Sequence, residues 1–203
     1  MDEDVIEEEN RIKGNNDLKV KVDGFRKIYP ALVRPPILAV ERTSFGLDYG
    51  ECFALLGING AGKTTTFKAL TCEIEPTAGT ISINGFNVQK QFNEARKLIG
   101  YCPQHDCIFD LVTVEEHLEY YARIKGIPTH IRQSLIERQI VDMNLAEHRK
   151  KPAGTLSGGN KRKLSVAMAI LGNPPIILLD EPSAGMDPEA RRFMWQVVAR
   201  ISQ

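Results

Sequence analysis

The chain has 203 residues, of which 42% are hydrophobic and 26% are charged, a composition typical of a globular protein with a substantial core. Its 26 Lys and Arg residues balance its 26 Asp and Glu residues, so no overall basic field favours nucleic acid or anionic lipid. No apolar run reaches the roughly 18 residues that a membrane-spanning helix needs, and the acidic start is unlike a signal peptide.

The first part of the chain predicts a tail followed by strands. Residues 1–16 are rich in acids and poor in large apolar side chains, so we expect a solvated acidic linker. Residues 18–22 alternate apolar and basic side chains, which predicts a half-buried strand, and residues 44–48 predict a second one. The Pro-Pro pair within residues 32–36 predicts a loop between them.

The next segment carries the most specific motif. Residues 52–56 form a short apolar run typical of a buried strand, and residues 63–70 favour a helix. Between them, G-I-N-G-A-G-K-T fits the phosphate-binding loop pattern G-x-x-x-x-G-K-[ST]. Glycines let backbone N–H groups surround a phosphate, Lys63 adds a mobile charge, and the Thr64 hydroxyl is a ligand for Mg²⁺. The predicted nucleotide-binding residues here are Gly57, Asn59, Gly60, Ala61, Gly62, Lys63, Thr64 and Thr65.

The middle of the chain changes from strands to helices. Residues 80–83 end at Asn-Gly, a hairpin signal, and residues 98–101 predict a further short strand. Thr113 opens a capping box and a helix, and residues 131–143 predict another helix. We therefore expect an α-helical insert over residues 110–152.

Two adjacent carboxylates follow the clearest buried strand. Residues 176–179 are wholly apolar, and Asp180 and Glu181 come directly after them. Open α/β sheets bind ligands at the carboxyl ends of their strands. Asp180 is therefore expected to hold Mg²⁺ through water, and Glu181 to polarise the attacking water as general base. A final helix is expected over residues 188–202.

A second anion-binding segment opens the helix expected at residues 157–171. In L-S-G-G-N, Ser157 suits the N-cap, and Gly158 and Gly159 leave backbone N–H groups accessible to an anion. A capped helix start without a ligand remains the alternative at this point. One domain has no evident need for two phosphate-binding loops, so the segment is interpreted as serving a nucleotide held by another copy.

These motifs and their order resemble the ATPase domain of ABC transporters. The resemblance implies an α/β fold, a P-loop NTPase (RecA-like) core with an antiparallel β subdomain and an inserted α-helical subdomain, over residues 17–203. It also implies that Gln104 contacts Mg²⁺ and links to the membrane domain, that Tyr29 stacks on adenine, and that residues 183–187 cross a dimer interface. The implied catalytic residues are Glu181, Lys63 and Gln104, and the implied metal-binding residues are Thr64, Gln104 and Asp180.

Longer matches, among them L-S-G-G-N-K-R-K-L-S, resemble the A subfamily and its second nucleotide-binding domain. This resemblance implies ATP and Mg²⁺ as cofactors and head-to-tail dimerisation with a second cassette. The other implied partners are the transmembrane domains of the same transporter, with no nucleic acid. The domain would then lie on the cytoplasmic face of a membrane and power transport, many members moving lipids.

Two departures from the family pattern matter. Asn160 stands where the wider family has Gln, and no histidine follows Asp187, although the family's next strand carries one that contacts the γ-phosphate. We therefore expect a chain truncated at its C-terminal end, nearly inactive alone, with residues 52–56 left at an unpaired sheet edge. A soluble ABC ATPase acting on ribosomes or DNA is the alternative function, and a regulatory nucleotide-binding module is a third.

Overall fold

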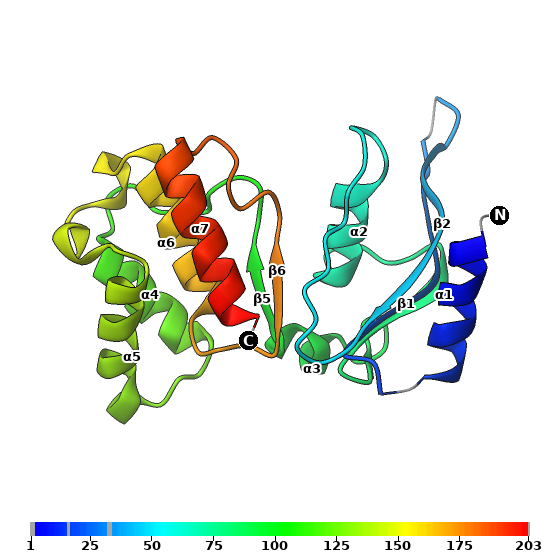
Figure 1. The fold of residues 1–203 in the computed structure, drawn as a ribbon, viewed down its shortest axis with the longest axis horizontal. Helices are drawn as coiled ribbons and strands as arrows, with labels where there is room; N and C mark the ends of the chain where they lie inside the picture. Colours follow the sequence, from blue (N-terminus) through cyan, green and yellow to red (C-terminus); the bar gives the residue numbers. More distant parts are fainter. Residues whose placement is uncertain (1–2, 16, 32–33, 203) are drawn as a thin grey trace. The chain divides into compact units, whose positions relative to one another are not determined.

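The computed structural model describes residues 3–15, 17–31 and 34–202, and they divide into two compact units at Leu98/Ile99 (Figure 1). The elements of the first unit are α1 (Glu3–Gly14), β1 (Val20–Tyr29), β2 (Ile37–Leu47), α2 (Lys63–Leu70), β3 (Ala78–Ile83), β4 (Phe86–Asn87) and α3 (Phe92–Lys97). Those of the second are β5 (Ile99–Cys102), α4 (Val114–Ile124), α5 (Thr129–Asp142), the 3₁₀ turns Ala146–His148 and Ala153–Thr155, α6 (Gly158–Ile170), β6 (Ile176–Leu179) and α7 (Pro188–Ile201).

The first unit is built on an antiparallel sheet in the order β2-β1-β3-β4. Val22 of β1 pairs with Phe45 of β2 on one side and with Ile81 of β3 on the other, and all three are buried. The predicted strands at residues 18–22, 44–48 and 80–83 are thus confirmed, although β1 and β2 run longer than expected. Asn-Gly at residues 84–85 takes positive φ at both positions and turns the chain into β4, as its composition predicts.

The acidic N-terminal segment is a helix, which corrects the expectation of a solvated linker. Most of α1 is exposed, but it contacts β1 and β2, and Ile12 is 0% exposed. Glu9 is buried beside it and pairs with Arg42 of β2 at 2.9 Å. The acidic composition suggested a solvated segment. One apolar residue, Ile12, is nevertheless buried where α1 packs on the sheet, and this contact anchors the helix.

α1 also satisfies backbone groups of the sheet's outer strand. The N–H of Gly46 in β2 donates to the Glu8 carboxylate at 2.9 Å, and its C=O accepts from the Arg11 guanidinium at 2.6 Å. Arg11 in turn pairs with Glu8 and with Asp48. The hydrogen bond from Arg11 holds the pKa of Glu8 below its usual range, so the acceptor for Gly46 stays ionised at neutral pH.

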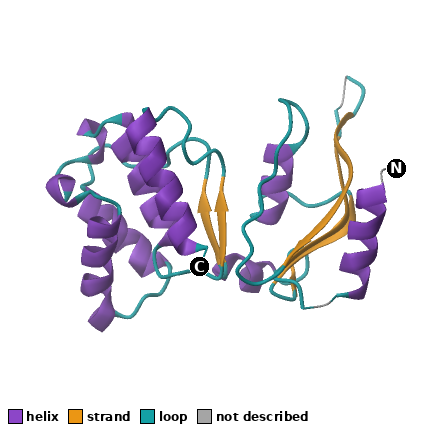
Figure 2. Ribbon diagram, viewed as in Figure 1, coloured by secondary structure: helices purple, strands orange, loops and turns teal. Residues whose placement is uncertain are grey.

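The predicted strand at residues 52–56 does not form, and Figure 2 draws the stretch before α2 as a loop. Within the described residues this segment has no ladder partner. Phe53 stacks on Phe45 at 4.9 Å, whereas Leu56 is 87% exposed. A buried strand needs neighbours for both its backbone edges and its side chains, and the apolar run alone does not supply them.

The second unit contains a parallel strand pair packed among helices (Figures 1 and 2). β5 and β6 pair in register from Ile99↔Ile176 to Cys102↔Leu179, and the Asp180 N–H extends the ladder by donating to the Cys102 C=O at 2.9 Å. α6 packs on both strands, and its residues 162–169 are all buried. The helices of residues 110–152 share one hydrophobic core with α6, α7 and β5.

The helix starts in this unit follow the predicted capping residues. Thr113 forms a complete capping box with Glu116 at the start of α4. Ser157 caps α6 by accepting from the Asn160 N–H, and Asp187 caps α7 with Pro188 in its first turn. Among the described residues, no helix is both long and apolar enough to cross a membrane.

The anchoring of α1 predicts different costs at two isoleucines of the same helix. Ile12→Ala is expected to lower the free energy of unfolding by about 2–4 kcal/mol because it leaves a cavity against the sheet. Ile6→Ala, at a position 46% exposed, is expected to cost less than about 0.5 kcal/mol. Urea unfolding of both variants checks this, and equal small losses would mean that α1 does not dock.

Candidate functional site

The phosphate-binding loop of the first unit has the backbone that its glycines predict. Gly60 and Gly62 both have φ of 87°, in the left-handed region that glycine adopts without strain. A Cβ on Gly62 would lie 2.7 Å from the Ala39 carbonyl oxygen of β2, so close packing also requires glycine there. α2 begins at the next residue, and the first N–H groups of a helix have no partner within the helix.

Lys63 lies across this loop. Its ammonium donates to the carbonyl oxygens of Gly57 at 2.6 Å and of Ile58 at 3.0 Å. Thr64, the next residue, is exposed, whereas Thr66 is buried and bonds back to the Gly62 carbonyl. The loop therefore presents a cation, a hydroxyl and helix N-terminal amides together, which is the donor set that binds a phosphate chain.

Tyr29 ends β1 in the first unit and is partly buried. The Lys27 ammonium lies 5.2 Å from the centre of its ring, and it also donates to the Glu75 carbonyl at 2.7 Å. The adenine-stacking role of Tyr29 stays a prediction.

In the second unit, the two carboxylates after β6 differ in environment. Asp180 is 8% exposed and sits at the last step of the strand ladder, whereas Glu181 is exposed. Glu181 has φ of 48°, a left-handed conformation that costs a residue with a Cβ about 1–2 kcal/mol.

Gln104 and Glu181 meet in the structure. Gln104 follows β5, and its Nε2 donates to Oε2 of Glu181 at 3.2 Å. Because β5 and β6 are parallel neighbours, the residues after their carboxyl ends lie at one edge of the sheet. Gln104, Asp180 and Glu181 are therefore gathered in one unit, whereas Lys63 and Thr64 belong to the other.

The L-S-G-G-N segment forms the start of α6. Besides its cap at Ser157, it has a side-chain anchor, because the Asn160 amide nitrogen lies 2.9 Å from Nε2 of His148. A Cβ on Gly158 would meet nothing within 4 Å, so neither packing nor a positive φ requires glycine at this position. The adjacent Gly159 would bring its Cβ only into ordinary contact with Ala190.

The segment at residues 183–187 leads into α7. Met186 is 5% exposed, and the Asp187 carboxylate accepts from the N–H groups of Ala190 and Glu189. These hydrogen bonds lower the pKa of Asp187, so its cap is ionised at neutral pH.

One residue that the sequence patterns did not single out contacts both loops that carry predicted catalytic residues. Arg162 of α6 is 3% exposed and donates to the carbonyl oxygens of Asp180 and Glu181. Arg162 is the middle residue of the run K-R-K, whose composition is typical of an exposed basic segment. Only its burial in α6 shows that its role differs from that of a surface cation.

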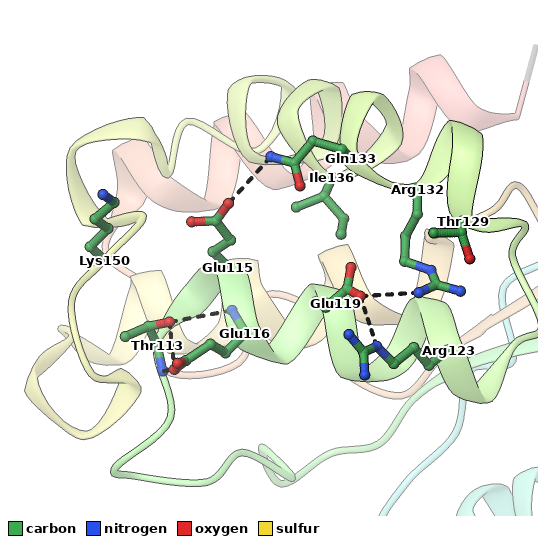
Figure 3. Close-up of a pocket in the computed structure, with 10 residues that line it drawn as sticks. All are labelled: Thr113, Glu115, Glu116, Glu119, Arg123, Thr129, Arg132, Gln133, Ile136 and Lys150. Carbon is green, nitrogen blue, oxygen red and sulfur yellow. Dashed lines mark hydrogen bonds and ion pairs between the residues drawn. The ribbon is translucent and has the colours of Figure 1, made fainter.

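A cavity of about 570 Å³ lies elsewhere in the second unit, between α4 and α5 (Figure 3). Glu119 lies between two arginines, Arg123 at 2.7 Å and Arg132 at 3.1 Å, and the hydrogen bond from Arg123 lowers the pKa of Glu119. No residue that lines this cavity belongs to the predicted nucleotide site. Its lining residues are Thr113, Glu115, Glu116, Glu119, Arg123, Thr129, Arg132, Gln133, Ile136 and Lys150.

The left-handed backbone of Glu181 predicts how two substitutions there affect stability. Asn tolerates the left-handed region better than Gln, so Glu181→Asn should have a free energy of unfolding about 1 kcal/mol higher than Glu181→Gln. Glu189 of α7 is the helical control position. There, Glu189→Gln should have a free energy of unfolding a few tenths of a kcal/mol higher than Glu189→Asn. Chemical denaturation of the four variants measures both differences, and the same preference at both positions would contradict a left-handed Glu181.

Comparison with known proteins agrees with this arrangement. The model of the family described as ABC transporter matches residues 40–184. The chain is 45% identical over 200 residues to human ATP-binding cassette sub-family A member 2, covering 97% of this chain and 8% of the relative. It is 46% identical to human retinal-specific phospholipid-transporting ATPase ABCA4, with 98% and 9% covered, and 45% identical to mouse phospholipid-transporting ATPase ABCA3, with 100% and 12% covered. The chain thus spans a small part of the length of these relatives.

Solved structures share the fold. The ATP-binding subunit of an ABC transporter matches with a TM-score of 0.78 and 28% identity, covering 90% of this chain and 74% of that one. A dimeric ATP-binding cassette in a post-hydrolysis state, bound to ADP and Pi, matches with a TM-score of 0.81 and 24% identity, covering 91% and 83%. The α/β cassette fold expected from the motifs is therefore confirmed, and the chain belongs to the ABC transporter family, as an ATP-binding ATPase domain with relatives in the A subfamily.

Proposed function

We propose that this domain powers transmembrane transport of lipid, as the second nucleotide-binding domain of an A-subfamily transporter on the cytoplasmic face of a membrane. The observation that carries the proposal is the contact between Gln104 and Glu181 beside buried Asp180. A regulatory module that only binds nucleotide has no need for a general base aligned by an amide at the sheet edge. The names of two relatives, phospholipid-transporting ATPases, support lipid as the cargo.

In the proposed reaction each residue acts on a different part of the nucleotide. The Lys63 ammonium leaves the carbonyls of its own loop to neutralise the β- and γ-phosphates, while the amides at the start of α2 bind the same oxygens. Glu181 accepts a proton from the attacking water, and Gln104 orients the Glu181 carboxylate. Tyr29 stacks on the adenine.

The donor set for a metal suits Mg²⁺. The Thr64 hydroxyl, the Asp180 carboxylate and the Gln104 amide oxygen are all hard oxygen ligands, which Mg²⁺ prefers, and the set contains no sulfur or imidazole. The bound ion would supply positive charge to the phosphate oxygens.

Gly158 supports dimerisation with a second cassette. Because nothing in the described part of the chain requires glycine there, the bare surface at the start of α6 suits close approach by an outside group. A nucleotide held by the phosphate-binding loop of a second cassette fits, since Ser157, Gly158 and Gly159 expose helix N-terminal amides to an anion. The solved cassette bound to ADP and Pi is dimeric, which supports the same assembly.

Residues 1–203 alone are expected to hydrolyse ATP negligibly. Among the histidines, His117 is buried and accepts from the Phe109 N–H, and His148 contacts Asn160, so both rings are engaged elsewhere. The zero net charge does not favour the alternative of a soluble ABC ATPase on ribosomes or DNA.

Turnover by the full-length protein tests the motor function. Glu181→Gln should lower Mg²⁺-dependent ATP hydrolysis about 100-fold or more while ATP binding persists, because the amide cannot accept the proton. Glu189→Gln, an exposed carboxylate in the first turn of α7, is the control and should keep full activity. A parent protein that binds ATP without hydrolysing it would support the regulatory module instead.

Substitution of Gly158 tests the dimer. Gly158→Ala should leave the free energy of unfolding nearly unchanged, since its Cβ meets open space, yet should weaken ATP-dependent association of the two cassettes and lower turnover. Gly14→Ala on α1 also places a Cβ in open space and should affect neither property. Normal turnover and association in Gly158→Ala would show that no partner approaches this position.

A further inference from the structure

Arg162 connects the two loops that carry the predicted catalytic side chains. Its guanidinium donates to the backbone after β5, where it reaches the carbonyl oxygens of Pro103 and Gln104. It also donates to the backbone after β6. There the acceptors are the carbonyl oxygens of Asp180, Glu181 at 2.9 Å and Pro182 at 3.2 Å. One buried side chain thus holds the main chain of Gln104 and Glu181 at the same time.

The charge of Arg162 is balanced inside the same cluster. Oδ1 of Asp106 accepts from Arg162 at 3.2 Å and from the Ser165 hydroxyl at 2.8 Å, one turn further along α6. The Arg162 side chain is 4% exposed, so its desolvation must be offset by these hydrogen bonds. Removing the guanidinium would leave carbonyls of both loops without their donor.

Only an arginine matches this arrangement. Its planar fork presents N–H groups in fixed directions to acceptors on two sides, whereas a lysine ammonium is a point charge with fewer donors. Glu181 needs such restraint, because its left-handed backbone is strained and persists only where surrounding contacts hold it. A shift of either loop would change the 3.2 Å contact between Gln104 and Glu181.

The place of Arg162 on α6 adds a second role to the same contacts. The helix begins at Gly158, so the segment proposed to bind the partner's nucleotide lies one turn before Arg162. The next residue, Lys163, lies 4.7 Å from the centre of the Phe193 ring and ties α6 to α7. A displacement of the start of α6 would therefore be transmitted to the loops that carry Gln104 and Glu181.

We propose that Arg162 is a positioning residue for ATP hydrolysis. It holds the backbones of Gln104 and Glu181 at a fixed separation, and it links their geometry to the nucleotide bound at the start of α6. The proposal rests on the proposed function. Arg162 touches neither nucleotide nor water in this role, so its loss should slow the chemical step without weakening ATP binding.

The test compares Arg162→Met and Arg162→Lys in the full-length protein, with ATP as substrate. Arg162→Met should lower kcat by about 10–100-fold with KM changed less than about 2-fold, and Arg162→Lys should recover part of the loss. The control Arg123→Met, which removes an exposed arginine paired with Glu119, should leave both constants unchanged. A KM rise equal to the kcat loss, or wild-type kcat in Arg162→Met, would overturn the proposal.

A double-mutant cycle separates positioning from general support of the fold. If Arg162 acts through Glu181, Arg162→Met should cause no further loss of kcat in a Glu181→Gln background, whereas independent effects would multiply. If Arg162→Met does not fold, Asp106→Asn replaces it, because this change removes only the charge that orients the guanidinium. If the kcat losses of the two single variants multiply in the double variant, the positioning role is overturned.

Failure of the proposed function gives a different result. A wild-type protein without hydrolysis, or a Glu181→Gln variant with full turnover, would refute the motor reading before Arg162 is tested. With hydrolysis present and lost in Glu181→Gln, normal kinetics of both Arg162 variants would refute only the inference about Arg162.

Discussion

The parallel pairing of β5 with β6 is the contact on which the second unit depends. It brings the carboxyl ends of both strands to one edge, and the Asp180 N–H extends it by one more hydrogen bond to Cys102. The predicted catalytic residues of this unit, Gln104 and Glu181, lie within two residues of that last bond. Cys102 itself is part of the packed core, where burial raises the pKa of its thiol to about 12 and leaves it a hydrophobic side chain rather than a nucleophile.

The strained backbone of Glu181 at the edge of this sheet is held by hydrogen bonds from Arg162. Glu181 departs from the strand in a conformation that most side chains avoid, and the contacts that hold it come from α6 rather than from the strand. The catalytic role proposed for Glu181 agrees with the general concentration of backbone strain at active sites.

Local patterns in the sequence predicted the features that depend on neighbouring residues. The caps at Thr113 and Ser157 and the Asn-Gly hairpin were predictable because a few adjacent side chains decide them. Contacts distant in sequence were not. Residues 52–56 were wrongly predicted as a strand because their apolar run cannot reveal which partner pairs with them.

The missed side chains have the same physical origin. Ile12 lies in an acidic segment and Arg162 in a basic one, and each is buried only because of an element far along the chain. Of the candidate site, the sequence patterns predicted the groups that would touch nucleotide or metal, and those roles stay predictions. The residues that hold those groups in place had no signal of their own.

The contact of α1 with Gly46 has a consequence for how the domain can be handled. β2 is an outer strand of its sheet, and outer strands invite pairing with strands of other molecules. Glu8 and Arg11 occupy the outward N–H and C=O of Gly46 and leave no place there for a foreign strand. Shortening the protein to remove its acidic start would open this edge, and aggregation would follow from the loss of a helix that composition alone marks as dispensable.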